Sequence, residues 1–318
     1  MIQSQTVPNV LKAFDHLLNT EIQNWKLEIP EKFGRGYCMG FTFNTHIRMI
    51  ISNYELNEDI IVENLDLNHS KKTLFFKFQN IFPATETLPG EILSKTPPSV
   101  LIGTSSLNTD TVIPIHTNTA TINIEIDADY LSELFEISEK STILYNLLQN
   151  KQPLLFEQML YPSLQKIADE IISESISKTF KLFFLRIKAE ELICRLLIEL
   201  EKRDTKQLYT LNSTDIEKIY KVKQQMLEDL SIPPVINDLA IAANMSPTKL
   251  KNLFKQIFGN SIFNYYQEFR MKEAAILLKQ GNLSVSDVGY KLGFTNLSHF
   301  SKVFAAHTGV KPKQYSKS

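Results

Sequence analysis

The sequence of 318 residues is poor in cysteine, with only Cys38 and Cys194, and contains a single tryptophan. The two cysteines lie far apart and lack CxxC spacing, which argues against a disulfide framework or a structural zinc site and favours a reducing cytoplasm. No run of about 18–20 uninterrupted apolar residues occurs, so a membrane-spanning helix is not expected. The N-terminus lacks a basic segment followed by an apolar one, and no signal peptide is expected either.

A catalytic or cofactor-binding constellation is also missing from the sequence. His46, His69 and His116 fall in a β-rich region, but no two of them have the HxH or HxxxH spacing of converging metal ligands. The glycines of GRGYCMG (34–40) are not followed by a helix, which argues against a phosphate-binding loop. We therefore expect no metal, no cofactor and no enzymatic activity.

The charge is unevenly distributed along a chain of ordinary globular composition. The whole sequence has a net charge of −1, whereas residues 213–318 carry 14 Lys and Arg against 8 Asp and Glu, a net of +6. Residues 1–212 hold the remaining 20 basic and 27 acidic residues, a net of −7. This split fits a module that binds a polyanion joined to one that does not. A solvated basic surface would have the same composition.

The segment VSDVGYKLGFTNLSHFSKVFAAHTGVKPKQY (285–315) has the spacing of a helix-turn-helix. A short helix over 285–292 is followed by Gly293, where a chain leaving a helix needs positive φ, and a second helix begins at Thr295 or Asn296. Two short helices joined by a tight glycine-containing turn present the second helix to the DNA major groove.

Another helix-turn-helix lies closer to the N-terminus, so it is the first of the two in chain order and 285–315 is the second. Ser246 and Pro247 are a typical N-cap and first residue of a helix over 247–258, which Gly259 ends. A helix over 235–243 comes before it, and a long helix over 261–279 would connect the two units rigidly. Thr214 and Glu217 have capping-box spacing and predict a further helix over about 214–230.

The two recognition helices, 247–258 and about 296–307, each have an apolar face that packs inward and a polar face that is left outside. Hydroxyl, amide, imidazole and ammonium groups of this kind contact base edges and phosphates, although ordinary solvated helices carry them too. The candidate DNA-binding residues are Thr248, Lys249, Lys251, Asn252, Lys255, Asn296, Ser298, His299 and Lys302.

The region from about Asp215 to Tyr315 resembles the DNA-binding domain of the AraC/XylS family of bacterial transcription regulators. The likeness is carried by Leu239-Ala240, Met245-Ser246, Leu250, Phe254, Gly259, Arg270, Ala274, Leu277-Leu278, Val288, Gly293-Phe294, Ser298, Phe300, Phe304, Gly309, Pro312 and Tyr315. The resemblance implies base contacts from Thr248, Lys251 and Asn252 in the first helix-turn-helix. In the second helix-turn-helix it implies base contacts from Asn296, Ser298, His299 and Lys302. Lys302 stands where the family often has Arg, which weakens the expectation of bidentate guanine recognition there.

The N-terminal half predicts a different fold. Short strands recur between residues 37 and 126 with turn-forming clusters between them, which is typical of a small antiparallel sandwich or barrel. Helices are then predicted over 129–135, 154–171 and 177–203. The last has an apolar arc wide enough to pack on two sides, either between the β domain and a partner subunit or on the core of the β domain alone.

We therefore predict an α+β multidomain chain: a β-rich sensor domain (1–130), a helical dimerisation and linker region (131–212) and an all-α double helix-turn-helix domain (213–318). The N-terminal half also resembles the sensors of the family's siderophore-responsive branch, through GRGYCMGFTF and KAEELICRLLIELE. That likeness implies a small-molecule effector, such as an iron chelate. The expected partners are promoter DNA, a second copy in a homodimer and, for an activator, RNA polymerase.

Two alternatives remain open at this point. In the first, the N-terminal domain binds no effector and serves only protein contacts. In the second, the chain is a DNA-modifying enzyme that carries an AraC-type module, which would require a reactive, thiolate-favouring cysteine.

Overall fold

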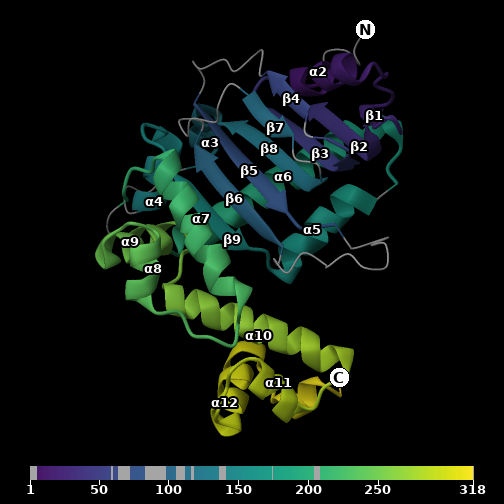
Figure 1. Ribbon diagram of the computed structural model, residues 1–318. Helices are drawn as coiled ribbons and strands as arrows, with labels where there is room; N and C mark the ends of the chain where they lie inside the picture. Colours follow the sequence, from purple (N-terminus) through teal and green to yellow (C-terminus); the bar gives the residue numbers. More distant parts are fainter. Residues whose placement is uncertain are drawn as a thin grey trace. The chain divides into compact units, whose positions relative to one another are not determined.

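The computed structural model of the chain describes residues 6–58, 60–63, 72–82, 98–104, 112–115, 118–135, 141–173, 175–203 and 208–317. His69 and His116 lie outside these residues. The chain divides into two compact units, Met1–Leu211 and Asn212–Ser318 (Figure 1).

The first unit is built on an antiparallel sheet. Its seven strands follow the order β1-β2-β3-β8-β5-β6-β9, and two further strands, β4 and β7, pair with each other. The strands are β1 (Lys26–Glu28), β2 (Gly34–Thr42), β3 (Ile47–Leu56), β4 (Ile60–Glu63), β5 (Thr73–Gln79), β6 (Ser99–Thr104), β7 (Val112–Ile115), β8 (Asn118–Asp127) and β9 (Leu155–Met159).

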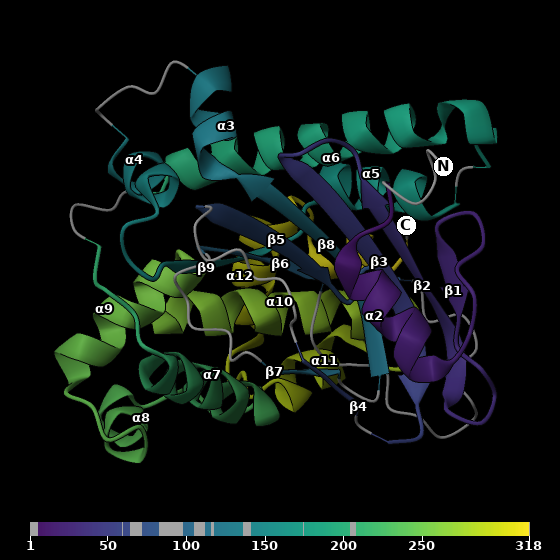
Figure 2. The same ribbon diagram turned by 90° about the horizontal axis from the view of Figure 1, so that it is seen from above.

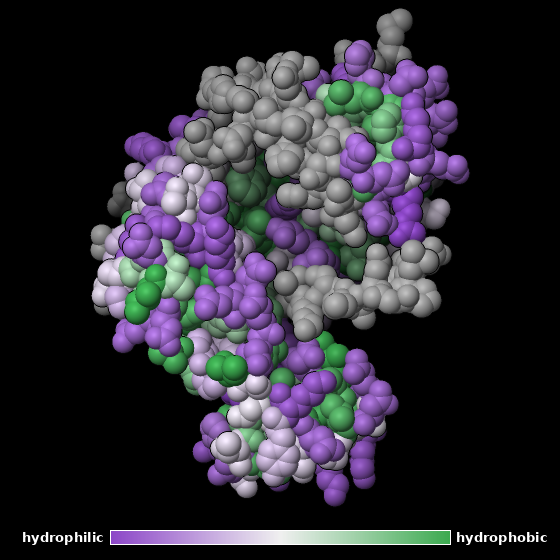
Figure 3. Space-filling model, in the orientation of Figure 1, coloured by the Kyte–Doolittle hydropathy of each residue, from purple (hydrophilic) through white to green (hydrophobic). Residues whose placement is uncertain are grey.

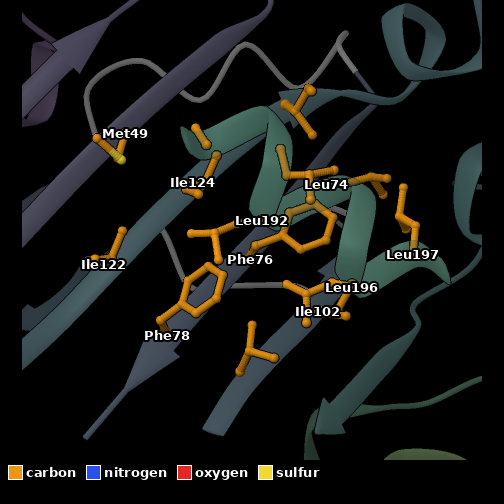
Figure 4. Packing of buried hydrophobic residues seen from close by; sticks show 14 of the residues in the cluster. Met49, Leu74, Phe76, Phe78, Ile102, Ile122, Ile124, Leu192, Leu196 and Leu197 are labelled. Atoms are coloured by element: carbon orange, nitrogen blue, oxygen red, sulfur yellow. The ribbon is translucent and has the colours of Figure 1, made fainter. Parts of the chain in front are cut away.

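Helices cover one face of the seven-stranded sheet, while the two-stranded sheet lies on its other side (Figure 2). The helices of this unit are α2 (Asn9–Leu18), α3 (Ala128–Leu134), α4 (Thr142–Gln149), α5 (Pro162–Ser173) and α6 (Lys178–Glu201). Successive side chains of a strand point to opposite faces, so every second residue of the central strands enters the core. Figure 4 shows Phe76 and Phe78 of β5 beside Leu192 of α6 in this core. Burying each such side chain contributes about 1.5–3 kcal/mol.

A smaller core fills part of the opposite face. Leu11, Phe14 and Leu18 of α2 belong to one cluster with Cys38 of β2 and Tyr54 of β3. The helix α2 presents these residues at positions i, i+3 and i+7, which places them on one face. The sheet is therefore packed on both faces at its β2–β3 end.

Several features of this unit differ from the sequence-based expectation. The seven-stranded sheet is open, with β1 and β9 at its edges, and does not close into a barrel. The helix predicted over 154–171 is wrong in its first part: Leu155–Met159 is strand β9, which pairs with β6, and α5 begins at Pro162. Because the short segment Leu155–Met159 fits a strand as well as a helix turn, periodicity alone misassigned it. The prediction also missed α2, α4 and β1.

The helices α3 to α6 contribute side chains to the same hydrophobic core as the sheet. The β domain and the helices that follow it thus pack together within the first unit. A role for these helices in dimerisation remains a prediction.

The second unit is helical throughout its described residues. Its helices are α7 (Ser213–Glu228), α8 (Ile236–Ala242), α9 (Pro247–Phe258), α10 (Ile262–Gln280), α11 (Val285–Lys291), α12 (Leu297–Thr308) and α13 (Pro312–Tyr315). The bounds predicted for α9 are those observed, and α10, α11 and α12 lie within one or two residues of their predicted positions.

Candidate DNA-binding surface

The first helix-turn-helix consists of α8 and α9. The turn contains Asn244 with a positive φ of 49° and closes where the N–H of Met245 donates to the carbonyl of Ala240. The Ser246 hydroxyl then accepts a hydrogen bond of 3.2 Å from the N–H of Lys249, and Pro247 occupies the first helical position. Ser246 therefore satisfies a donor that the helix itself leaves unpaired, which fixes the start of α9.

The second helix-turn-helix, α11 and α12, repeats this construction. Ser284 and Asp287 form a capping box at the start of α11. The hydrogen bonds from Ser284 lower the pKa of the Asp287 carboxyl below its usual value. Gly293 has a φ of 77°, and the N–H of Phe294 donates to the carbonyl of Gly289 across the same five-residue separation as in the first turn. Asn296 caps α12 by accepting from the N–H of His299 at 3.0 Å.

Each recognition helix buries one face and exposes the other. Leu250 and Phe254 of α9, and Phe300 and Phe304 of α12, are buried in the second unit. The structure leaves eight of the nine candidate residues exposed and Asn252 half-buried, and every one lies on α9 or α12 or at the N-cap of α12. The exposed candidates are Thr248, Lys249, Lys251, Lys255, Asn296, Ser298, His299 and Lys302.

The helix α10 joins the two helix-turn-helix units. It has 19 residues, which corresponds to about 28 Å. The Tyr266 hydroxyl donates a 2.8 Å hydrogen bond to the carbonyl of Leu230, in the segment that leads into α8. One turn further on, Arg270 donates from Nε to the carbonyl of Leu292 at 3.1 Å, and its guanidinium lies 3.9 Å from the centre of the Phe294 ring. Adjacent turns of α10 thus hold the segment before α8 and the turn between α11 and α12.

Arg270 is a residue whose role the sequence patterns did not reveal. It is 5% exposed, and burial lowers the pKa of its guanidinium, but an arginine stays protonated in a protein. The available signal was that Arg270 is the only arginine in residues 213–318, in an otherwise lysine-rich domain. Its planar fork suits a carbonyl acceptor and an aromatic face at once.

The N-terminus of α7 also differs from the expectation. The predicted capping box of Thr214 and Glu217 is wrong, because Asn212 is the N-cap and accepts from the N–H of Asp215 at 2.7 Å. The side chain of Asp215 is engaged in turn by Lys249, whose Nζ lies 2.9 Å from Oδ1. One of the nine candidate residues is therefore already ion-paired within the domain.

Other chemistry receives little support from the described residues. They contain no group of three metal-ligating side chains and no helix long and apolar enough to cross a membrane. Cys38 is 4% exposed, and burial raises the pKa of its thiol to about 11. A thiol with such a pKa carries little thiolate near neutral pH, which disfavours Cys38 as an enzymatic nucleophile.

Comparison with known proteins identifies the second unit. Residues 239–318 match a family model described as a helix-turn-helix domain. The HTH-type transcriptional regulator GbdR of Pseudomonas aeruginosa is 28% identical over 142 residues, which is 45% of this chain and 35% of that protein. The arabinose operon regulatory protein of Escherichia coli is 32% identical over 71 residues, which is 22% of this chain and 24% of that protein. The matches therefore span about a third or less of these relatives.

A solved structure is similar to about a third of the chain. It is a transcriptional regulator of Chromobacterium violaceum, described as containing an AraC-type DNA-binding domain, and it aligns with 33% of this chain and 95% of its own at 28% identity and a TM-score of 0.31.

The second unit is thus a tandem helix-turn-helix domain. It is a DNA-binding domain of the AraC type, and the relatives that share it are transcription regulators.

Proposed function

We propose that the whole chain is a sequence-specific transcription regulator that places α9 and α12 in successive major-groove segments. The observation that carries this proposal is the repetition of one turn construction in two helix-turn-helix units joined by α10. Recognition elements on one face of a duplex must lie about one turn, or roughly 34 Å, apart. Basic side chains on both recognition helices would supply phosphate affinity. The amide, hydroxyl and imidazole side chains of the same helices would contact base edges.

A gel-shift experiment with the DNA upstream of the chain's own gene tests this placement. Lys251→Ala on α9 and His299→Ala on α12 should each weaken binding or alter the sequence preference. Lys221→Ala is a matched control, because Lys221 is an exposed lysine of α7 outside both recognition helices. The placement is wrong if Lys251→Ala and His299→Ala both behave like this control.

We further propose that the first unit binds a small-molecule effector on the sheet face opposite α6. Lys77 of β5 lies on this face between its cross-strand neighbours Leu101 and Asn123, and burial lowers the pKa of its ammonium group. Ser52 and Thr121, on the same face, are buried polar residues. Figure 3 shows hydrophilic and hydrophobic side chains next to one another where this face of the sheet is in view. Such a mixture is typical of small-molecule sites.

Thermal-shift screening with siderophores, sugars and fatty acids tests the sensor proposal. A siderophore-type iron chelate is the class that the resemblance of the N-terminal half favours. A ligand that stabilises the protein should lose most of its effect in Lys77→Met, which keeps the aliphatic stem and removes the charge. The absence of stabilisation by every class would favour the alternative of an effector-independent regulator whose first unit makes only protein contacts.

The outer face of α6 favours a homodimer. Four apolar residues of this helix are 44–67% exposed: Phe180, Phe183, Ile187 and Ile198. The residues of this face are arranged symmetrically about the Glu190–Glu191 pair. Phe183 lies seven residues before Glu190, and Ile198 lies seven after Glu191. In the same way, Ile187 lies three residues before Glu190 and Cys194 three after Glu191. The half before Glu190 carries only basic charges, while the half from Glu190 onward carries four glutamates and one arginine. A two-fold, antiparallel pairing would therefore match apolar to apolar and basic to acidic residues.

The dimer is tested by sedimentation. Phe183→Glu should shift the protein to a monomer, whereas Lys202→Glu, at an exposed site just beyond α6, should not. In such a regulator an effector would act by binding one arrangement of the paired DNA-binding domains better than another. If the regulator is an activator, RNA polymerase would be a further partner.

A further inference from the structure

The lysine nearest the start of the first recognition helix is held by a carboxylate of its own domain. Lys249 is the third residue of α9, and its Nζ lies 2.9 Å from Oδ1 of Asp215 on α7. The Lys249 side chain is 49% exposed and that of Asp215 only 11%. The lysine thus stands at the surface where DNA is expected, while its counterion lies beneath it.

Asp215 is fixed by a second contact. Its Oδ2 accepts a 3.1 Å hydrogen bond from Nδ2 of Asn212, and its own N–H donates to Oδ1 of Asn212. The carboxylate therefore has two donors, one of them charged, and it lies in the first turn of α7 where a helix favours negative charge. This arrangement holds the anion in place for Lys249.

A lysine in an ion pair contributes less to DNA binding than a free one. The electrostatic part of DNA affinity comes from counterions that are released as protein cations neutralise phosphates. An ammonium whose charge is already balanced by a carboxylate releases fewer of them, and a DNA phosphate must displace that carboxylate to engage it. Asp215 therefore competes with DNA for the same donor.

We propose that Asp215 is an internal competitor of the DNA phosphate at Lys249 and so sets the affinity and salt dependence of the first helix-turn-helix unit. This inference rests on the proposed DNA-binding function. Asn212, which holds Asp215, is the first residue of the second unit and directly follows the segment that joins it to the first. A change in that segment that moves Asn212 would loosen Asp215 and free Lys249 for DNA.

Salt-dependent DNA binding by the full chain tests the competition. Fluorescence anisotropy would compare wild type, Asp215→Asn, Lys249→Gln and the double variant across salt concentrations. Asp215→Asn should tighten binding and steepen the dependence of log K on log salt by about 0.9, the effect of one additional phosphate contact. That slope adds roughly a threefold loss of affinity between 50 and 200 mM salt. Lys249→Gln alone should leave the wild-type slope nearly unchanged, and Asp215→Asn should have no effect in the Lys249→Gln background.

Glu217→Gln is the matched control, because it removes the same charge from an exposed residue two positions further along α7. If Asp215→Asn changes the slope no more than this control, the competition does not exist. If Lys249→Gln alone lowers the wild-type slope by about 0.9, Lys249 already contacts phosphate and the inference is overturned. This outcome can be measured even if the Asp215→Asn variant does not fold stably. Failure of the wild type to bind DNA would refute the proposed function instead.

Discussion

Gly293, in the turn of the second helix-turn-helix, gives the sharpest test of how the two helix-turn-helices are joined within the second unit. Its φ of 77° is in the left-handed region, and a Cβ placed on it would lie 2.0 Å from the carbonyl oxygen of Ser231. Ser231 belongs to the segment between α7 and α8, next to Leu230, whose carbonyl accepts from Tyr266. The substitution Gly293→Ala therefore presses a methyl group against the backbone of the segment that leads into the first helix-turn-helix.

The structure also contains a matched control. Gly309, at the C-terminus of α12, has almost the same φ of 78°, but a Cβ there would meet no atom within 4 Å. Gly309→Ala should destabilise the domain by about 1 kcal/mol, through the left-handed conformation alone. Gly293→Ala incurs the same penalty and must also displace a backbone atom by more than 1 Å, an overpacking effect of about 1–3 kcal/mol. The expected total for Gly293→Ala is thus about 2–4 kcal/mol.

Urea unfolding of the full chain measures the difference with two probes. Far-UV circular dichroism follows the helices of both units, while the fluorescence of Trp25, the only tryptophan, follows the first unit alone. Gly293→Ala should lower the circular-dichroism midpoint of the second unit by roughly 1–2 M urea, and Gly309→Ala by less than 1 M. The Trp25 transition should stay in place in both variants.

Equal midpoints for the two variants would refute the reasoning. They would mean that the segment around Ser231 moves away freely, and that this segment does not hold the turn between α11 and α12. A shift of the Trp25 transition would mean that the substitution acts beyond its own unit.

Three further predictions follow from individual contacts. Under oxidising conditions, Ile187→Cys should form a disulfide-linked dimer through Cys194 of the partner subunit. The wild type, which has only Cys194 at this face, should not form it, and neither should the double variant Ile187→Cys, Cys194→Ser. A thiol reagent at pH 8 should modify Cys38 only slowly in the native protein, because burial raises the pKa of its thiol to about 11; fast modification of two thiols would contradict this. Arg270→Ala should destabilise the second unit by about 2–4 kcal/mol, since it leaves the buried Leu292 carbonyl unpaired and removes the stacking on Phe294, and Arg270→Lys should restore only part of this in the same unfolding assay.

The helix-turn-helix units were predictable because their signals are local. Ser246 with Pro247, and Ser284 with Asp287, mark helix starts within a few residues of chain, and Gly259 marks a helix end. Each of these residues satisfies or terminates a backbone pattern next to it, so no knowledge of the rest of the fold is needed. The outward faces of α9 and α12 follow from the same local period.

The first unit was less predictable because its architecture depends on distant pairings. The strand β8 lies between β3 and β5 in the sheet, and β9 joins β6 from a position about fifty residues further along the chain. Nothing near Leu155 distinguishes a strand that pairs with β6 from the start of a helix, and Pro162 was the local sign that the helix begins later. The openness of the sheet is likewise a property of strand order and not of any one segment.

Lys249 shows why exposure read from a helical period is not the same as availability for binding. The period correctly places its side chain outside, but Asp215, 34 residues earlier in the chain, holds its ammonium group. A loss of DNA binding in Lys249→Ala would therefore have two explanations, since the substitution removes a cation from the surface and also releases a buried carboxylate from its partner. Only the salt slope separates them, because a lost phosphate contact changes the number of released counterions and a loosened α7–α9 contact does not. For this domain, a substitution scan of the recognition helices identifies DNA contacts only when it is carried out as a function of salt.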